Sequence, residues 1–279
     1  MATPSPIVPI TVTDIDDPRL ADYRHLKDRD LSAEGGRFIA ESERVVRRLL
    51  ASGLEIHSLL LTPSRWTSLG AELDTIACPV YVASQALLND IAGFHVHWGC
   101  LAVGQRPPSS VVPETARAIV VLEDLVDADN LGASVRNAAA FGADALVLSP
   151  RCADPFYRKA IRVAIGATFM LPIVRLTAWP DDVLALKRRL GLAVFGAVLG
   201  FHATPLSVVD RPSKFALLLG SEGPGLSPGA RAACDQLITI PMAAGADSLN
   251  VATAGAVALF HLLQGAALPS LPSATAAGH

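Results

Sequence analysis

The sequence contains few cysteines, and they do not form pairs. Its four cysteines, Cys78, Cys100, Cys152 and Cys234, lie far apart, and no C-x-x-C pattern occurs. This spacing argues against a disulfide framework and against a zinc site built on paired cysteines. Reduced thiols in a cytosolic protein are the simpler interpretation.

The sequence also shows no pattern typical of a secretory signal or of a membrane span. The first ten residues, MATPSPIVPI, lack a basic segment followed by a long apolar core. The most membrane-like stretch, Val251–Leu268, contains His261 and Gln264 and is rich in alanine and glycine. This composition indicates a buried helix rather than a membrane span. We therefore expect a cytoplasmic protein.

The chain lacks the positive charge that most nucleic-acid-binding proteins carry. Its formal net charge is −3, so any contact with phosphate must come from local basic patches. Each patch alone is more simply interpreted as a solvated helix face. The candidates are Arg44/Arg47/Arg48, Arg151/Arg158/Lys159/Arg162 and Lys187–Arg189.

Several common catalytic motifs are missing. There is no G-x-x-x-x-G-K-[ST] phosphate loop, no G-x-S-x-G elbow and no H-E-x-x-H zinc motif. Gly220, Gly223 and Gly225 have the reverse of the dinucleotide-binding order, which argues against an NAD-dependent oxidoreductase. His95 and His97 would share one face of a possible strand, but no third ligand is nearby, so no metal site is predicted.

Strand and helix patterns alternate along almost the whole chain, which contains 51% hydrophobic and 18% charged residues. Such a chain is typical of packed α/β domains. The segment QRPPSSVVPETA interrupts every periodicity and predicts an extended linker. The predicted organisation is an arm (1–17), a small α/β domain (18–105), the linker (106–116), a doubly wound parallel domain (117–266) and a disordered tail (267–279).

Two loops in the second domain predict a ligand site. Phe215–Leu219 and Leu237–Ile240 resemble buried strands, and each is followed by a loop rich in glycine and polar residues. Ligands of open α/β sheets bind beyond the carboxyl ends of the strands. The polar residues of three strand-to-helix loops of this domain include no strong nucleophile, which suits transfer of a methyl group from a sulfonium donor. They are Asn130, Arg136, Asn137, Glu222, Ser248 and Asn250.

Three segments closely resemble the motifs of a known enzyme family. They are DNLGASVRNAAAFGADALVLSP (129–150), LLLGSEGPGLSP (217–228) and IPMAAGADSLNVATAGAVALF (240–260). The family is the SpoU (TrmH-like) branch of the SPOUT superfamily, whose members are S-adenosyl-L-methionine (AdoMet)-dependent RNA ribose 2′-O-methyltransferases. Residues 36–62 and 97–107 resemble the substrate-binding domain that precedes many SpoU catalytic domains and is similar to a small ribosomal protein.

The resemblance implies a methyltransferase domain with a deep trefoil knot, through which the last helix is threaded. It also implies a homodimer formed through the catalytic domain and an RNA substrate, with rRNA favoured over tRNA. A tRNA 2′-O-methyltransferase and a non-catalytic knotted RNA-binding protein remain the alternatives. The residues expected to bind AdoMet are Leu219, Gly220, Ser221, Gly223, Ile240, Met242 and Leu249.

The same resemblance assigns catalytic positions to Asn130, Arg136, Glu222, Ser248 and Asn250. Arg136 matches an arginine proposed to help deprotonate the ribose hydroxyl. A guanidinium stays protonated far above neutral pH, so we expect Arg136 to grip a phosphate and stabilise the developing alkoxide. Asn130 would cap a helix and orient the ribose, and Glu222 would order its loop and pair with Arg136. Ser248 and Asn250 would cap the last helix or contact the ligands.

Overall fold

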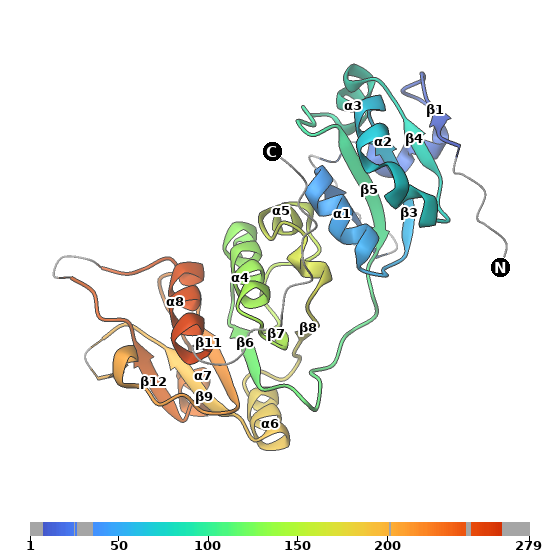
Figure 1. Ribbon diagram of the computed structural model, residues 1–279. Helices are drawn as coiled ribbons and strands as arrows, with labels where there is room; N and C mark the ends of the chain where they lie inside the picture. Colours follow the sequence, from blue (N-terminus) through green and yellow to red (C-terminus); the bar gives the residue numbers. More distant parts are fainter. Residues whose placement is uncertain (1–7, 25, 27–35, 201, 244–246, 264–279) are drawn as a thin grey trace. The chain divides into compact units, whose positions relative to one another are not determined.

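The chain contains two separate β-sheets, each at the centre of one of two structural units (Figure 1). The computed structural model describes residues 8–24, 26, 36–200, 202–243 and 247–263. The first unit comprises residues up to 109 together with 131–136 and 153–170. The second comprises 110–130, 137–152 and the chain from 171 onward.

The first unit contains a five-stranded mixed sheet with the order β1-β4-β3-β5-β2. β3 pairs in parallel with β4 and antiparallel with β5. The strands are β1 (Ile10–Thr11), β2 (Arg37–Glu41), β3 (Ile56–Leu61), β4 (Val80–Val82) and β5 (Cys100–Gln105). The helices are η1 (Pro18–Tyr23), α1 (Glu43–Ala51), α2 (Pro63–Leu69), η2 (Gly70–Thr75) and α3 (Gln85–Ala92).

The predicted arm is not wholly separate from this sheet. Residues 1–17 were expected to stand apart, but Ile10 and Thr11 pair in parallel with β4. The side chain of Val12 is buried in the core beside them. A strand of two residues is too short to show a period-2 pattern, so no local pattern predicts it.

A segment from the middle of the chain completes the core of the first unit. It contains α5 (Arg158–Val163) and η3 (Ala167–Phe169) and was predicted to belong to the second domain. The Phe38 ring lies 5.3 Å from that of Phe156 and 5.2 Å from that of Phe169, measured between centroids. Arg158 donates a 2.6 Å hydrogen bond to the buried carboxylate of Glu41. The segment therefore packs on the first sheet through apolar and ionic contacts.

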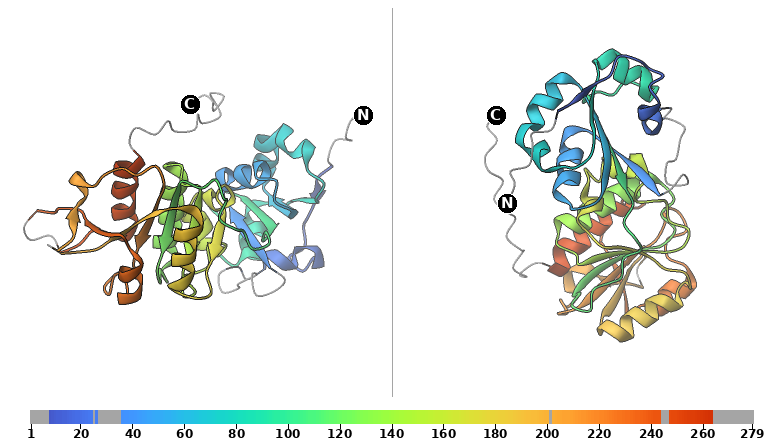
Figure 2. Two further views of the ribbon diagram at one scale, coloured as in Figure 1. Left: turned by 90° about the horizontal axis from the view of Figure 1, so that it is seen from below. Right: turned by 90° about the vertical axis from the view of Figure 1, so that its right-hand side faces the viewer.

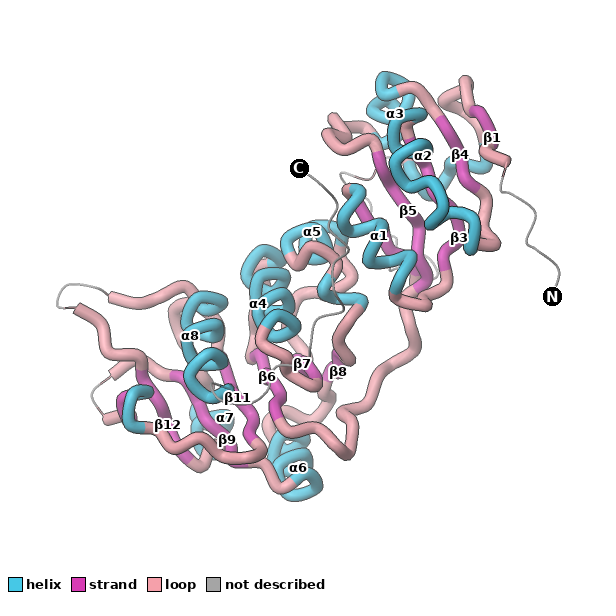
Figure 3. Tube along the Cα trace, in the orientation of Figure 1, coloured by secondary structure: helices cyan, strands magenta, loops and turns pink. Residues whose placement is uncertain are grey.

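The second unit confirms the predicted parallel α/β sheet (Figure 3). Its seven strands have the order β10-β12-β9-β11-β6-β7-β8, and every neighbouring pair is parallel. The strands are β6 (Ala118–Leu122), β7 (Ala145–Leu148), β8 (Ile173–Arg175), β9 (Ala193–Ala197), β10 (Thr204–Pro205), β11 (Phe215–Leu219) and β12 (Gln236–Thr239).

Helices cover both faces of this sheet (Figure 2). α6 (Asp181–Leu190) and α7 (Pro228–Ala233) pack on one face, and α4 (Ala128–Ala140) and α8 (Val251–Leu263) on the other. A short η4 (Leu206–Val208) follows β10. Because both faces are covered, β6 and β11 are buried at every position.

The proline-rich linker is anchored at both ends. Arg106 forms an ion pair with Asp154 in the first unit. Val112 is buried in the core of the second unit, where its carbonyl oxygen accepts a hydrogen bond from Arg189. Among the described residues, no helix is long and apolar enough to cross a membrane. The predicted tail, 267–279, lies outside the described residues.

Candidate functional site

The loop after β11 folds back tightly on itself. The backbone N–H of Gly225 donates a 3.0 Å hydrogen bond to the carbonyl oxygen of Ser221. A Cβ atom on Gly220 would lie 2.3 Å from the carbonyl carbon of Gly225, and Gly223 has a left-handed backbone (φ +85°). Only glycine meets both requirements without strain. The two glycines therefore create a compact loop whose backbone is open to a ligand.

A buried carboxylate anchors this loop from the neighbouring strand. Glu123, directly after β6, accepts hydrogen bonds from the backbone N–H of Ser227 (2.8 Å) and from the Trp179 ring nitrogen (2.6 Å). Its own N–H donates to the carbonyl oxygen of Leu219. Beside it, hydrogen bonds from Arg151 and Ser149 lower the pKa of Asp124. Both carboxylates therefore have structural partners, which sequence reasoning did not identify.

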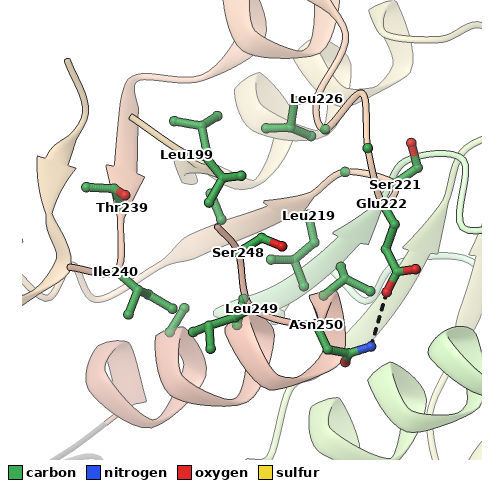
Figure 4. Close-up of a pocket in the computed structure, with 18 of the residues that line it drawn as sticks. Leu199, Leu219, Ser221, Glu222, Leu226, Thr239, Ile240, Ser248, Leu249 and Asn250 are labelled. Atoms are coloured by element: carbon green, nitrogen blue, oxygen red, sulfur yellow. Dashed lines mark hydrogen bonds between the residues drawn. The ribbon is translucent and has the colours of Figure 1, made fainter. Parts of the chain in front are cut away.

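Asn250 joins three segments of the chain. Its Oδ1 accepts hydrogen bonds from the backbone N–H groups of Ala252 (3.0 Å) and Thr253 (3.3 Å), so it caps α8 as predicted. Its Nδ2 donates to Oδ1 of Asn130 (2.7 Å) and to Oε1 of Glu222 (3.2 Å), the second of which is drawn in Figure 4. One amide thus connects the first turn of α4, the loop after β11 and the start of α8.

Two predicted contacts of this group are wrong. Asn130 does not cap α4, because Asp127 accepts the hydrogen bonds from the N–H groups of residues 129 and 130. α4 begins earlier than its apolar pattern indicates, and the Asn130 side chain is left to contact Asn250. Glu222 bonds to Asn250 and not to Arg136. The Asn137 side chain donates a 2.8 Å hydrogen bond to the carbonyl oxygen of Ala252 and so connects α4 with α8.

A cavity of about 720 Å³ lies at the carboxyl ends of β9, β11 and β12 (Figure 4). The structure brings together there all seven residues that were predicted to bind the cofactor, and three of those predicted to be catalytic. They are Leu219, Gly220, Ser221, Gly223, Ile240, Met242 and Leu249, together with Glu222, Ser248 and Asn250. Asn130 is connected to this group through Asn250, whereas Arg136 does not line the cavity.

Comparisons with known proteins identify the fold that carries this cavity. The model of the SpoU rRNA methylase family matches residues 117–260. The chain belongs to this family. An uncharacterized tRNA/rRNA methyltransferase of Mycobacterium bovis is 39% identical over 260 residues, which cover 89% of this chain and 90% of that protein. All three motif segments lie within the SpoU match.

Two further relatives carry more specific names. The 23S rRNA (guanosine(2553)-2′-O)-methyltransferase RlmP of Bacillus subtilis is 30% identical over 245 residues, covering 88% of this chain and 95% of RlmP. The crystal structure of an AdoMet-bound rRNA methyltransferase from Sinorhizobium meliloti superimposes with a TM-score of 0.78 at 26% identity. That match covers 90% of this chain and 96% of the other.

Arg136, in the first SpoU motif, forms no hydrogen bond with the polar group of Asn130, Glu222 and Asn250. It lies on α4, six residues after Asn130, and its side chain is exposed. Within the described part of the chain, Arg136 has neither a hydrogen bond nor an ion pair. A guanidinium without a protein partner is free to bind an anionic ligand.

Leu199 and Thr239 also line the cavity, and sequence reasoning missed them. Leu199 follows β9, which lies between β11 and β12 in the sheet. The rule that ligands bind beyond strand ends would have found it if the strand order had been known. Leu199 is 62% exposed and Leu249 is 39% exposed, so the cavity offers apolar surface that a ligand can cover.

His95, His97 and the four cysteines do not line the cavity. His95 and His97 were placed on a possible strand, but they lie in the loop before β5, with ring centroids 4.4 Å apart. In the described ranges, no group of three or more His, Cys, Asp or Glu side chains could hold a metal ion. All four cysteines are free, and burial raises the pKa of Cys78 and of Cys234 to about 11.

Replacing Asn250 with alanine removes the cap of α8 and both side-chain bridges. We expect a loss of about 1 kcal/mol in the free energy of unfolding from the cap, which corresponds to a fall of about 2–4 °C in Tm for a chain of this size. Thermal denaturation measures this effect. Ser248→Ala is the control, because the Ser248 side chain forms no hydrogen bond with any described residue. Equal Tm values for the two variants would contradict the capping and bridging roles of Asn250.

Proposed function

We propose that this protein is an AdoMet-dependent methyltransferase that modifies a ribose 2′-hydroxyl in structured RNA, with rRNA as the favoured substrate. The observation that carries the proposal is the cavity, because every residue expected to bind the cofactor lines it. Membership of the SpoU family and the similarity to RlmP support the reaction type. An rRNA substrate implies that the enzyme acts in the cytoplasm.

The residues of the cavity fit AdoMet. The apolar side chains of Leu199 and Leu249 would contact the adenine, and backbone groups of Leu219–Gly223, Ile240 and Met242 would form its hydrogen bonds. The close approach at Gly220, where no Cβ can be accommodated, leaves these backbone groups accessible. The carboxylates of Glu222 and Asp247 would stabilise positive charge in the same space. When bound, AdoMet supplies an activated methyl group attached to a sulfonium.

A second group of residues would hold the acceptor. Asn130 and Glu222, joined through Asn250, would orient the target ribose. Arg136 would bind the neighbouring phosphate and stabilise the alkoxide as the 2′-hydroxyl loses its proton. Because the guanidinium keeps its own proton, the phosphate or water would take the proton from the hydroxyl.

Three structural features belong to the same proposal. The N-terminal domain (18–105) would bind RNA as a ribosomal-protein-like substrate domain, and α8 would be threaded through a trefoil knot. The enzyme would be a homodimer formed through its catalytic domain. Val257 (40% exposed) and Phe260 (57% exposed) on α8 offer apolar surface for that contact, and the Phe260 ring packs edge-on against Phe141.

Transfer of label from AdoMet to RNA tests the proposal. The purified protein is incubated with labelled AdoMet and either total rRNA or total tRNA, and the RNA is digested to nucleosides. We expect the label in a 2′-O-methylnucleoside from the rRNA fraction. Label confined to the tRNA fraction would change the substrate, and label on a base would overturn the reaction. Absence of AdoMet binding in calorimetry would favour the non-catalytic RNA-binding alternative.

A further inference from the structure

The three arginines of α1 have different surroundings. Arg47 forms ion pairs with Glu43 (2.8 Å) and with Glu72, and its hydrogen bond is the main cause of the lowered pKa of Glu43. Arg44 is exposed and has no hydrogen bond or ion pair within the described residues. Arg48 bonds to a backbone carbonyl and to no described carboxylate. The positive charges of Arg44 and Arg48 are therefore not neutralised by described residues.

Arg48 is held in place by the turn that follows α5. Its Nη1 donates a 2.6 Å hydrogen bond to the carbonyl oxygen of Ile165. Ile165 has a left-handed backbone (φ +51°), which is unfavourable for a β-branched residue and is found mostly where surrounding contacts enforce it. A Cβ on Gly166 would lie 3.3 Å from the Cβ of Arg48. The stem and the guanidinium of Arg48 are thus both fixed.

α4 brings Arg136 to the same place. A Cβ on Gly132 would lie 2.6 Å from the carbonyl oxygen of Ala160 and 2.9 Å from the Cβ of Val163, so α4 packs directly on α5 there. Arg136 is one helical turn beyond Gly132 and shares its face. Burial is the main cause of a lowered pKa for Arg48, and the charges of Arg44 and Arg136 lower it further. The guanidinium of Arg48 therefore lies within electrostatic range of the guanidiniums of both Arg44 and Arg136.

We propose that Arg44, Arg48 and Arg136 form one binding site for the phosphate backbone of the substrate RNA, an inference that rests on the proposed function. None of these three arginines pairs with a described carboxylate. Their positive charges therefore favour a bound anion, which would reduce the repulsion that Arg48 experiences. The planar fork of arginine matches the oxygens of a phosphodiester. A helix of the N-terminal part and the first SpoU motif would then hold the same stretch of RNA backbone.

Equilibrium binding of deproteinised 23S rRNA, without AdoMet and over a range of salt concentrations, tests the site. Loss of one phosphate contact weakens binding irrespective of sequence and reduces the slope of log K against log salt by about 1. We expect Arg44→Ala to show this smaller slope and about tenfold weaker binding at low salt. Because Arg44 has no partner among the described residues, its removal leaves the fold intact.

Arg188→Ala provides the matched control. Arg188 is an exposed arginine of α6, in the second unit, without a partner in the described ranges, so its removal changes the net charge equally. We expect Arg188→Ala to bind like the wild type. An unchanged slope for Arg44→Ala would overturn the site, as would an equal loss in Arg188→Ala.

Binding and methyl transfer separate this inference from the proposed function. If the wild type binds 23S rRNA without methylating it and Arg44→Ala weakens the binding, the phosphate site stands and the proposed reaction fails. If Arg44→Ala binds and methylates like the wild type, the reaction stands and the phosphate site fails. A wild type that does not bind 23S rRNA at low salt would overturn the site directly.

Discussion

Arg136→Ala is expected to reduce methyl transfer to RNA by a factor of about 100–1,000, while AdoMet affinity stays close to that of the wild type. Removal of a preorganised group that stabilises transition-state charge has an effect of about this size. Arg136 does not line the cavity, so the variant should retain the cofactor. Single-turnover methylation and calorimetry with AdoMet measure the two quantities separately.

Arg136→Lys distinguishes charge from geometry. Lysine keeps the positive charge but loses the planar fork, so we expect an activity between those of the wild type and of Arg136→Ala. Asn137→Ala is the neighbouring control. Its side chain supports α8 through the carbonyl oxygen of Ala252, and its loss should affect Tm more than the rate of transfer. A parallel fall in AdoMet affinity and transfer rate for Arg136→Ala would contradict a role directed at the RNA.

Gly220→Ala should have the second large effect. The new methyl group would lie 2.3 Å from the carbonyl carbon of Gly225 and 2.4 Å from the backbone nitrogen of Leu226. Neither backbone atom can yield without opening the loop, and a displacement of about 1 Å in such a site can cost about a hundredfold in rate. We expect AdoMet affinity to fall by at least about tenfold in calorimetry, together with methyl transfer.

Gly191→Ala is the matched control for this substitution. Gly191 ends α6 with a left-handed backbone (φ +68°), and nothing lies within 4 Å of the position of its Cβ. Alanine there should lower the free energy of unfolding by about 1 kcal/mol, because an L residue is strained in this backbone conformation, and should leave AdoMet binding unchanged. If Gly220→Ala lost only stability, as Gly191→Ala should, the loop would have no direct role in holding the cofactor.

Local signals predicted much of the fold. Phe215–Leu219 forms a strand with the bounds that its apolar run predicts, and Leu237–Ile240 overlaps the observed strand Gln236–Thr239. The loops after parallel strands must meet at one edge of the sheet. For that reason Gly220 and Leu249, far apart in the sequence, could be assigned to one site, and both line the cavity.

The missed features depend on long-range packing. Nothing in the composition of residues 153–170 shows that they pack on β2, because an apolar helix face does not specify its partner sheet. The Asn130 amide could bond to its own helix or to Asn250, and only the tertiary structure decides between them. Leu199 was missed because strand order is not encoded locally.

The contribution of residues 153–170 to the first unit has a consequence for protein synthesis. When residue 109 has just left the ribosome, the N-terminal sheet still lacks Phe156 and Ile161 from its core, and Glu41 lacks the guanidinium of Arg158. Domains generally fold as units while the chain is being made. The first unit can complete its core only after the chain has been translated past residue 170. A fragment that stops at residue 109 would therefore expose the apolar face of β2 and resemble a nascent intermediate rather than a stable domain.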